Sequence, residues 1–377
     1  MLGTAPAASL YVNTAPSFYS VYEAPMRIGI PRELKPREGR VGLIPPACAE
    51  LVRHGHQVFV ERDAGVMSGY PDEQYTVVGC TIVPTHADVF ARGDLIVKVK
   101  EPVGEDLRCL EKRHLLFCYL HLAPLPELTR ALLKIGLTAI AFETVEDARG
   151  RLPLLAPMSD IAGRLSIQIG THLLHQPQGG KGILLGGVAT TRRGRVVILG
   201  AGVAGGNAAE VAAALGAQVT VFDTDRDKLE KMRALGANVT ALYPHTHDVA
   251  EAVARADLVV GAVLVTGARA PHVIGREMIE SMQAGSVVVD ISVDQGGCIE
   301  TTEPRTYDDP TYRYHDVVHF TVTNMPGAVP RTSSQALSAA VAPYVLRLAA
   351  GDWRKDPALV HGVNVEGGEI RLQALKG

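Results

Sequence analysis

A glycine-rich turn that follows a short apolar run places the strongest constraint on how this chain folds. The segment RVVILGAGVAGGNAAE (195–210) carries Gly200, Gly202 and Gly205 in a GxGxxG pattern, between a predicted strand and a predicted helix. The first glycine of such a turn permits the tight bend, the second lets the backbone approach a pyrophosphate, and the third lets helix and strand pack closely. Free N–H groups at the start of the helix favour the anion. The turn therefore predicts a dinucleotide-binding domain.

An acid at the end of the next predicted strand, QVTVFD (218–223), indicates which dinucleotide binds. Asp223 stands where a carboxylate accepts hydrogen bonds from the adenosine ribose hydroxyls. The same carboxylate would repel a 2′-phosphate, so the predicted cofactor is NAD and not NADP. Arg226, which lies nearby in the sequence, argues in the opposite direction.

Short β-rich runs alternate with longer helical runs from Met26 onward, in two series separated by a glycine-rich stretch at 178–194. The predicted strands of the first series are 27–31, 56–61, 94–100, 115–120 and 138–144, and those of the second are 195–200, 218–223, 257–263 and 286–292. Such alternation predicts an α/β fold, in which helices cover both faces of a parallel sheet. A chain of 377 residues is too long for one ordinary core and suits two domains.

A helical pattern returns at 334–351 but is too short to form a domain alone, so we expect it to pack back on the first domain. The predicted domains are then residues 26–152 together with 331–377, and residues 153–330, which carry the glycine turn. Residues 1–25 are small, polar and proline-containing, and we expect them to form a flexible extension.

The composition excludes several classes of function. A net charge of −3 gives no electrostatic reason to expect nucleic acid or an anionic membrane as a partner. The five cysteines are scattered and never spaced as CxxC, which argues against disulfides and structural zinc and favours reduced thiols in the cytoplasm. No segment has the length of a transmembrane helix or the pattern of a signal peptide. His245 and His247 alone are too few for a metal site, and no GxSxG motif is present.

Seven further blocks of sequence stand out, and several of them are long and ungapped. They are IGIPRELKPREGRVGLIP (28–45), IVKVKEP (96–102), YLHLA (119–123), PLLAPMSDIAGRLSIQIG (153–170), DLVVGAVL (257–264), DISVDQGG (290–297) and NMPGAVPRTSSQAL (324–337). Together they resemble the alanine dehydrogenase family, within the alanine dehydrogenase / pyridine nucleotide transhydrogenase superfamily. The resemblance implies two Rossmann-like, doubly wound parallel-sheet domains with the active site in the cleft between them. It also implies reversible, NAD-dependent oxidation of L-alanine to pyruvate and ammonia, and a homohexamer.

Two cations match the family's substrate-binding residues. Arg40, in PREGRVGL, and Lys100, in KVKEP, correspond to its arginine and lysine. A substrate carboxylate calls for cations, and arginine suits a planar, bidentate contact. Lys100 also ends a predicted parallel strand, and ligands of such folds bind at the carboxyl ends of strands. Solvated surface charges are the alternative for both residues.

Two further residues match those that move protons in the family. His121 follows the apolar run LLFCYL and corresponds to the catalytic histidine, a residue type that titrates near neutral pH. Asp294 follows the run SVVVDIS and corresponds to the second catalytic residue. A structural histidine is the alternative for His121. Asp290 is the competing acid, and its place within the strand suits a structural or ribose contact better.

The cofactor pocket is the expected place of six further residues. Met158, Ser159, Asn324 and Met325 resemble residues that line its nicotinamide side, while Val263 and Leu264 are expected near the adenosine or ribose. Core packing is the alternative for all six. No metal is expected.

Two other functions remain open at this point. One is the soluble nucleotide-binding part of a transhydrogenase, which would need no amino acid. The other is an NAD(H)-binding sensor that has lost catalysis. NADH formation that depends on alanine distinguishes both from the dehydrogenase.

Overall fold

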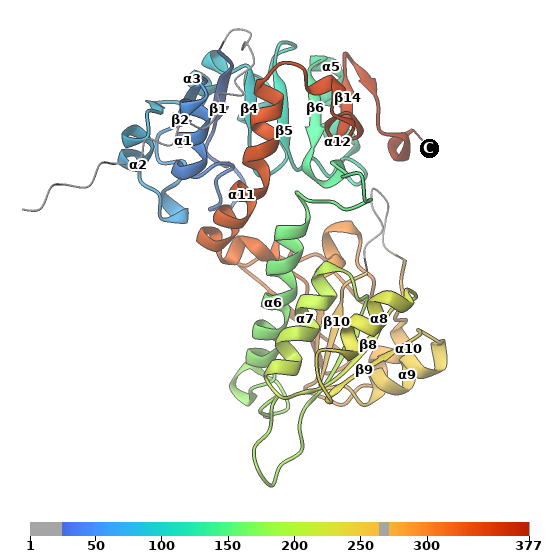
Figure 1. Ribbon diagram of the computed structural model, residues 1–377. Coiled ribbons are helices and arrows are strands. Elements are labelled where there is room, and N and C mark those ends of the chain that lie inside the picture. The colour runs from blue at the N-terminus through green and yellow to red at the C-terminus, as the bar shows by residue number, and fades with distance from the viewer. Residues whose placement is uncertain (1–24, 264–270, 377) are drawn as a thin grey trace, which may run out of the picture.

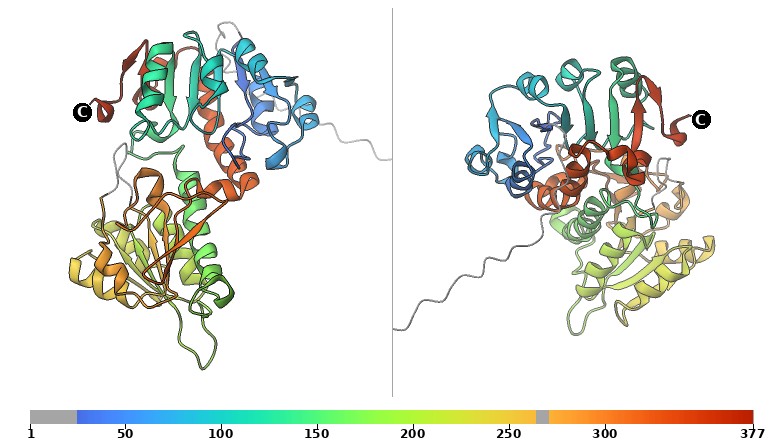
Figure 2. Two further views of the ribbon diagram at one scale, coloured as in Figure 1. Left: turned by 180° about the vertical axis from the view of Figure 1, so that it is seen from behind. Right: turned by 45° about the horizontal axis from the view of Figure 1, so that its top comes forward.

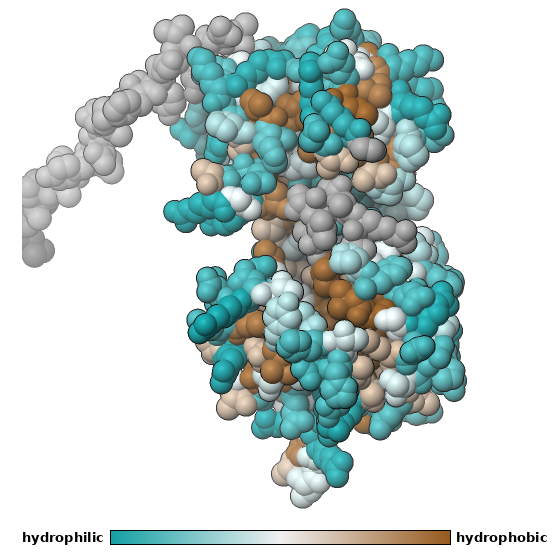
Figure 3. Space-filling view, turned by 90° about the vertical axis from the view of Figure 1, so that its right-hand side faces the viewer, coloured by the Kyte–Doolittle hydropathy of each residue, from teal (hydrophilic) through white to brown (hydrophobic). Residues whose placement is uncertain are grey.

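The computed structural model describes residues 25–263 and 271–376, which form two lobes (Figure 1). Each lobe is built on one mostly parallel sheet with helices packed against it, so the predicted α/β fold class is confirmed. Figure 3 shows the two lobes joined by a narrower middle. Residues 1–24, which make up most of the predicted extension, and Leu264, a predicted cofactor contact, lie outside the described residues.

The first sheet has eight strands. In spatial order they are β15 (Glu369–Ile370), β14 (Val363–Glu366), β6 (Thr138–Ala141), β5 (Leu115–Cys118), β4 (Leu95–Val97), β1 (Arg27–Ile30), β2 (Gln57–Glu61) and β3 (Thr81–Val83). Strands β1 to β6 are parallel, whereas β14 pairs antiparallel with β6. The C-terminal segment of the chain thus adds two strands to a sheet that the N-terminal segment begins.

The second sheet has seven strands. In spatial order they are β12 (Thr311–Tyr314), β13 (Val317–Phe320), β11 (Val287–Asp290), β10 (Leu258–Gly261), β7 (Arg195–Leu199), β8 (Gln218–Phe222) and β9 (Val239–Leu242). Only β12 is antiparallel to its neighbour. In both sheets the chain starts in the middle, winds outward in one direction and then in the other. The reversal points lie between β1 and β4 and between β7 and β10, where ligands of such folds bind, beyond the carboxyl ends of the strands.

Helices cover both faces of each sheet and connect the lobes (Figures 1 and 2). They are α1 (Pro45–Arg53), α2 (Asp72–Val77), α3 (His86–Arg92), α4 (Glu105–Cys109), α5 (Pro126–Ile135), α6 (Ala156–Leu173), α7 (Val203–Ala214), α8 (Arg226–Arg233), α9 (Thr246–Ala254), α10 (Arg276–Glu280), α11 (Pro330–Ala349) and α12 (Pro357–His361). Helix α6 packs on α7 and on α11. One buried apolar cluster therefore runs through both lobes, and each sheet has a further cluster of its own.

Three predicted strands of the first lobe are shorter than the sequence pattern indicated. Strands β4, β5 and β6 end at Val97, Cys118 and Ala141, and the residues that follow leave the sheet. Lys100 was expected to end a strand, but it lies in the loop after β4. The reason is a contact distant in the sequence: the N–H groups of Val99 and Lys100 donate to the carboxylate of Glu33, at 2.6 and 3.4 Å.

Candidate active site

The glycine turn leaves β7 and enters α7 with the geometry that its sequence predicts. Gly200 has a φ of +94°, and a Cβ added there would lie 2.5 Å from the carbonyl oxygen of Ala262. A Cβ at Gly205 would lie 1.8 Å from the carbonyl oxygen of Gly200. A Cβ at Gly202, by contrast, would meet nothing within 4 Å. Gly200 and Gly205 are therefore required by backbone packing, whereas Gly202 borders open space.

That open space fits a pyrophosphate. Gly202 is the N-cap of α7 and provides no side chain to satisfy the first N–H groups of the helix, which are donors without partners inside the helix. A helix start with free donors and a positive dipole end favours a phosphate group. The observed turn thus fits the phosphates of a dinucleotide.

Asp223 lies directly after β8 and faces the glycine turn. Its Oδ2 accepts from the N–H of Ala201 at 2.6 Å, and its Oδ1 accepts from the N–H of Asp225 at 2.8 Å. These bonds fix the carboxylate beside the turn. Each carboxylate oxygen has a further lone pair, which leaves acceptors for a ribose.

Arg40 lies buried at the junction of the lobes, with 2% of its surface exposed. Its Nε donates to Glu38 Oε1 at 2.7 Å and its Nη2 to Glu38 Oε2 at 2.5 Å. Nη2 also donates to Asn324 Oδ1, and the partner of Nη1 among the described residues is the sulfur of Met158, at 3.2 Å. Glu38 therefore takes one edge of the guanidinium. The Nη1 group faces a weak acceptor that a carboxylate would replace.

The ionised form of Glu38 is strongly favoured at this position. Burial by itself would raise the pKa of Glu38, but the charge and hydrogen bonds of Arg40 outweigh burial and lower it to about 2. Asn324 adds a hydrogen bond from Nδ2 to Glu38 Oε2 at 2.8 Å. Arg40 consequently stays charged and held by two neighbours.

Asn324 connects this pair to Asp294 in the other lobe. Its backbone is left-handed, with a φ of +66°, and its N–H donates to Asp294 Oδ2 at 3.3 Å. Asp294 lies in the 3-10 turn η4 (Ile291–Gln295) that follows β11, and it is exposed. The structure thus brings Arg40, Met158, Asn324 and Asp294 together.

Asp290, the competing acid, is buried and holds the same loop together. Its oxygens accept from the N–H groups of Ser292, Cys298 and Ile299 and from the hydroxyl of Thr302. These donors inside the protein explain this carboxylate without a ligand.

Lys100 lies in a second cluster, beyond β4. Its Nζ is 3.9 Å from Glu101 Oε2, and the other oxygen of Glu101 pairs with Lys35. All but 7% of the surface of Lys100 is buried. Burial opposes ionisation of Glu101, but the two lysines outweigh it and lower its pKa. One carboxylate therefore lies between two ammonium groups.

His121 lies just beyond β5, at the same sheet edge, with a left-handed φ of +47°. Its ring stacks on the ring of Tyr119, with centroids 5.6 Å apart and planes 5° apart. Tyr119 is buried near Arg40, whose charge opposes the rise that burial causes in the pKa of the phenol. In the described part of the chain, no hydrogen bond or ion pair joins His121 to Asp294; the two lie on elements of different sheets.

The remaining predicted residues have local partners. Ser159 lies in the first turn of α6, next to Met158. The carbonyl of Val263 accepts from the hydroxyl of Ser292 at 2.7 Å. Met325 is buried, in η5 (Met325–Ala328), and its carbonyl accepts from Tyr307.

Four carboxylates and one ring near these residues were missed by the sequence reasoning: Glu33, Glu38, Glu101, Glu143 and Tyr119. A signal existed for Glu143, which follows β6 as His121 follows β5. The pattern of 138–144 predicts one continuous strand, which places Glu143 inside the strand and so hides that signal. Glu38 and Glu101 adjoin predicted site residues in the sequence, but only their buried contacts distinguish them from surface acids.

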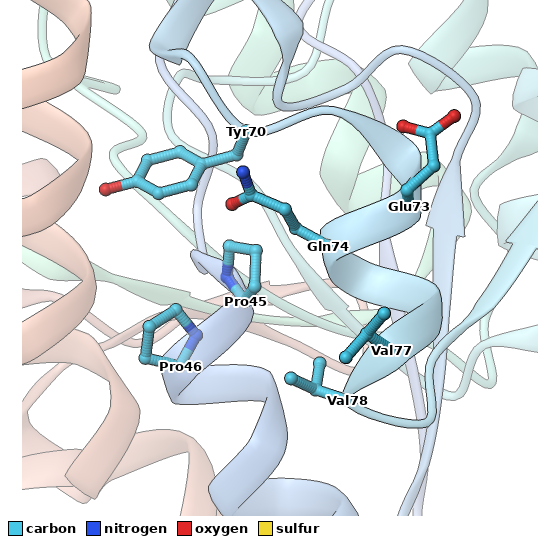
Figure 4. A pocket seen from close by; sticks show the side chains of 7 residues that line it. All are labelled: Pro45, Pro46, Tyr70, Glu73, Gln74, Val77 and Val78. Carbon is cyan, nitrogen blue, oxygen red and sulfur yellow. The ribbon is translucent and has the colours of Figure 1, made fainter.

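An open hollow of about 370 Å³ lies elsewhere, between α1 and α2 (Figure 4). Its lining is Pro45, Pro46, Tyr70, Glu73, Gln74, Val77 and Val78. None of the predicted site residues lines it, and its walls are mostly apolar. It therefore offers none of the cations or proton carriers described above.

Two exclusions apply to the described residues. Between residues 25 and 263 and between 271 and 376, no three His, Cys, Asp or Glu side chains are grouped so as to hold a metal ion. His247 lies in α9, with His245 at the N-cap. In the same ranges no helix has the length and apolarity needed to cross a membrane.

Comparison with known proteins agrees with this arrangement. Residues 29–162 match the family model described as "Alanine dehydrogenase/PNT, N-terminal domain", and residues 166–373 match "Alanine dehydrogenase/PNT, C-terminal domain". The chain is 46% identical to an alanine dehydrogenase from Geobacillus stearothermophilus, over 93% of this chain and 95% of that protein. It is 44% identical to one from Methanococcus maripaludis, again over 93% and 95% of the two chains.

Solved structures give the same result. A structure titled L-alanine dehydrogenase superposes with a TM-score of 0.88 at 48% identity, covering 93% of this chain and 98% of that one. A transhydrogenase from Sinorhizobium meliloti superposes with a TM-score of 0.79 at 25% identity, covering 92% and 99%. Two matched domains and identity well above 30% along most of the chain leave one conclusion: the chain belongs to the alanine dehydrogenase/PNT family.

Proposed function

We propose that the chain is an NAD-dependent alanine dehydrogenase, which converts L-alanine reversibly to pyruvate and ammonia. The observation that carries the proposal is the link from Arg40 through Asn324 to Asp294. It joins a carboxylate-binding cation to a proton carrier on the lobe that holds the glycine turn. Relatives 44–46% identical over 93% of the chain are named alanine dehydrogenases, which supports the same activity.

Arg40 and Lys100 would hold the substrate carboxylate. Glu38 occupies Nε and one N–H of Nη2 in Arg40, so a carboxylate can use chiefly Nη1. A single hydrogen bond from Arg40 would leave part of the negative charge of the substrate carboxylate without a partner. Lys100 would supply the second cation, which explains why the site needs both.

His121 and Asp294 would move protons to and from the substrate amine and the attacking water. The ammonium form of alanine must lose a proton before a hydride can leave Cα, so oxidation should be favoured by alkaline conditions. Asp294 is exposed and accepts one long hydrogen bond, which leaves acceptor capacity for such a role.

NAD would bind at the glycine turn, with Gly200, Gly202 and Gly205 beside its pyrophosphate and Asp223 on its ribose. Val263 and Leu264 would lie near the adenosine or ribose, and Met158, Ser159, Asn324 and Met325 near the nicotinamide. When bound, NAD supplies the acceptor for the hydride that leaves Cα.

We also propose a division into two domains, residues 26–152 together with 331–377, and residues 153–330. The strands that share each sheet support this division. We further propose a cytoplasmic location.

The direct test uses the purified full-length chain with L-alanine and NAD at alkaline pH. Absorbance at 340 nm should rise only when both are present. No rise under these conditions would contradict the proposal. A panel of small amino acids, with serine and 2-aminobutyrate included, would define the width of the pocket.

His121→Ala should abolish normal turnover, leaving at most a residual rate on the order of 10²- to 10⁴-fold lower, while NAD still binds, because the imidazole moves protons and does not lie at the glycine turn. Turnover and the Kd for NAD are measured on the same preparation. Retained turnover would remove His121 from the mechanism.

The second candidate is hydride exchange between two nucleotides, favoured by the superposition on the transhydrogenase. Such a protein would reduce a nucleotide analogue without any amino acid. Formation of NADH that depends on alanine separates it from the proposed activity. Normal NAD binding without activity toward any amino acid would instead indicate a catalytically inactive NAD(H)-binding sensor.

A further inference from the structure

Two consecutive backbone N–H groups beyond β5 bind the carboxylate of Glu143. Leu120 N donates to Oε1 and Oε2 of Glu143 at 3.1 and 3.2 Å, and His121 N donates to Oε1 at 2.6 Å. Glu143 lies in η2 (Phe142–Thr144), which follows β6 directly. Strands β5 and β6 are parallel neighbours (Figure 1), with Cys118 opposite Ala141. The carboxylate and both donors thus meet at one sheet edge.

These bonds hold a backbone conformation that His121 would not adopt by itself. A φ of +47° is in the left-handed region, which is unfavourable for a residue with a side chain and occurs where surrounding contacts enforce it. Consecutive N–H groups at such a turn form a concavity that favours an anion. The side chain of Glu143 is only 11% exposed, so water competes little for these donors.

The same carboxylate faces the imidazole. His121 Nδ1 lies 3.9 Å from Glu143 Oε1, and stacking on Tyr119 sets the plane of the ring. Tyr119 is itself fixed, because its hydroxyl donates to the carbonyl of Leu154 at 2.6 Å. Among the described residues, Glu143 faces His121 from the β6 side, and Glu101 interacts with it electrostatically from the β4 side.

We propose that Glu143 is the positioning residue for His121: it holds the backbone in the left-handed conformation and faces Nδ1, so that Nε2 is directed to the substrate. This inference rests on the proposed function. A carboxylate beside Nδ1 favours the tautomer with its proton on that nitrogen and stabilises the imidazolium formed when Nε2 takes up a proton. At 3.9 Å the contact is longer than a hydrogen bond, and binding of substrate is expected to shorten it.

The test is Glu143→Gln in the full-length chain. The amide oxygen can still accept from both backbone N–H groups, but the charge beside Nδ1 is lost. We expect kcat for alanine oxidation to fall on the order of 10- to 100-fold. The KM for alanine should stay within about threefold, because Arg40 and Lys100 bind the carboxylate. The Kd for NAD and the midpoint of thermal unfolding should not change.

Glu146→Gln is the matched control. It removes a carboxylate from the same loop, where the side chain of Glu146 is 41% exposed and near His361. Its kcat should equal that of the natural chain. If Glu143→Gln fails to fold, Glu143→Asp replaces it: the charge stays but the carboxylate is one methylene short, and an intermediate kcat is expected.

A double-mutant cycle distinguishes positioning from general support of the fold. His121→Ala is expected to leave a residual rate on the order of 10²- to 10⁴-fold below that of the natural chain, measured at high enzyme concentration. In that background, the further change Glu143→Gln should have no effect on the residual rate, because Glu143 acts through His121. A wild-type chain without alanine-dependent activity would refute the proposed function. An active wild type together with an unchanged kcat in Glu143→Gln, or with additive effects in the cycle, would refute only the role of Glu143.

Discussion

Buried charges in the first lobe form a chain of contacts behind the proposed site. Lys98 Nζ lies 3.3 Å from Glu33 Oε2 and 3.2 Å from Asp106 Oδ1. His86 continues the chain, with Nε2 3.0 Å from Asp106 and Nδ1 2.7 Å from Glu61. Glu33 also binds the N–H groups of Val99 and Lys100. The chain of buried charges therefore ends at the loop that carries Lys100, which is proposed to bind the substrate carboxylate. Removing one member would leave another buried charge without a partner, which is costly.

This network predicts a pH dependence of stability. Burial would lower the pKa of His86, but its bonds to Asp106 and Glu61 outweigh burial and raise the pKa to about 9. A raised pKa stabilises the fold fully below the ordinary value of 6.5 and progressively less as the pH rises through 9. The difference in free energy of unfolding between the natural chain and His86→Gln should therefore shrink by about 2–3 kcal/mol from pH 6 to pH 10. Urea unfolding at several pH values measures it.

His114 provides a matched control, because it is buried and its pKa is shifted in the opposite direction. Burial lowers the pKa of His114, so the ring is neutral throughout the alkaline range. The effect of His114→Gln should be constant between pH 7 and pH 10. A constant effect of His86→Gln over that range would contradict the assignment of a charged His86.

The β7–α7 turn is the element whose glycines have separable roles. Gly205 allows α7 to approach the carbonyl of Gly200, whereas Gly202 borders open space at the helix start, with a φ of −70° that any residue can adopt. The same close approach recurs where α6 crosses α7, since a Cβ at Gly163 would lie 2.1 Å from the carbonyl oxygen of Ala204. The glycines that packing requires are thus distinct from Gly202, which borders open space.

Two alanine variants test this separation. Gly202→Ala should leave the free energy of unfolding within about 1 kcal/mol of the natural value, and raise the Kd for NAD at least about tenfold, because the new methyl group lies where the pyrophosphate would approach. Gly205→Ala should lower the free energy of unfolding and should also weaken NAD binding. Denaturant unfolding and titration with NAD measure the two quantities. Unchanged NAD affinity in Gly202→Ala would mean that the dinucleotide binds elsewhere.

At the scale of the whole molecule, polar contacts hold the two lobes against each other. Arg37, in the loop after β1, pairs with Asp308 of the second lobe, and Glu38 binds Asn324. The Arg37–Asp308 pair is well exposed and contributes little to stability. The Glu38–Asn324 contact is part-buried and continuous with the proposed site. Relative motion of the lobes would therefore act directly on Arg40.

The state of assembly is a further prediction, from family resemblance alone. Light scattering coupled to size exclusion should give six times the chain mass of 40.2 kDa. The mass should not fall on dilution through the micromolar range. A mass of one or two chains would contradict the predicted homohexamer.

Much of the architecture could be predicted from the sequence. The Val/Ile/Leu runs that became β7, β8, β10 and β11 are buried on both faces, and such strands have a near-continuous apolar pattern. Edge strands such as β12 and β15, and the short β3, have mixed patterns and were not predicted. Strand ends were placed too late at β4, β5 and β6, because apolar residues continue after the backbone has left the sheet.

The sequence by itself determined the dinucleotide turn, the alternation of strands and helices, and the family to which the chain belongs. These depend on local pattern: glycine spacing, apolar periodicity and matched blocks. Only the tertiary structure decided which charges meet. Glu38 and Asn324 are far apart along the chain yet share Arg40, and Glu143 reaches the backbone of His121 only because β5 and β6 are adjacent. Burial is the physical reason. A carboxylate removed from water needs hydrogen-bond donors, and only the tertiary fold determines which donors lie within reach of it.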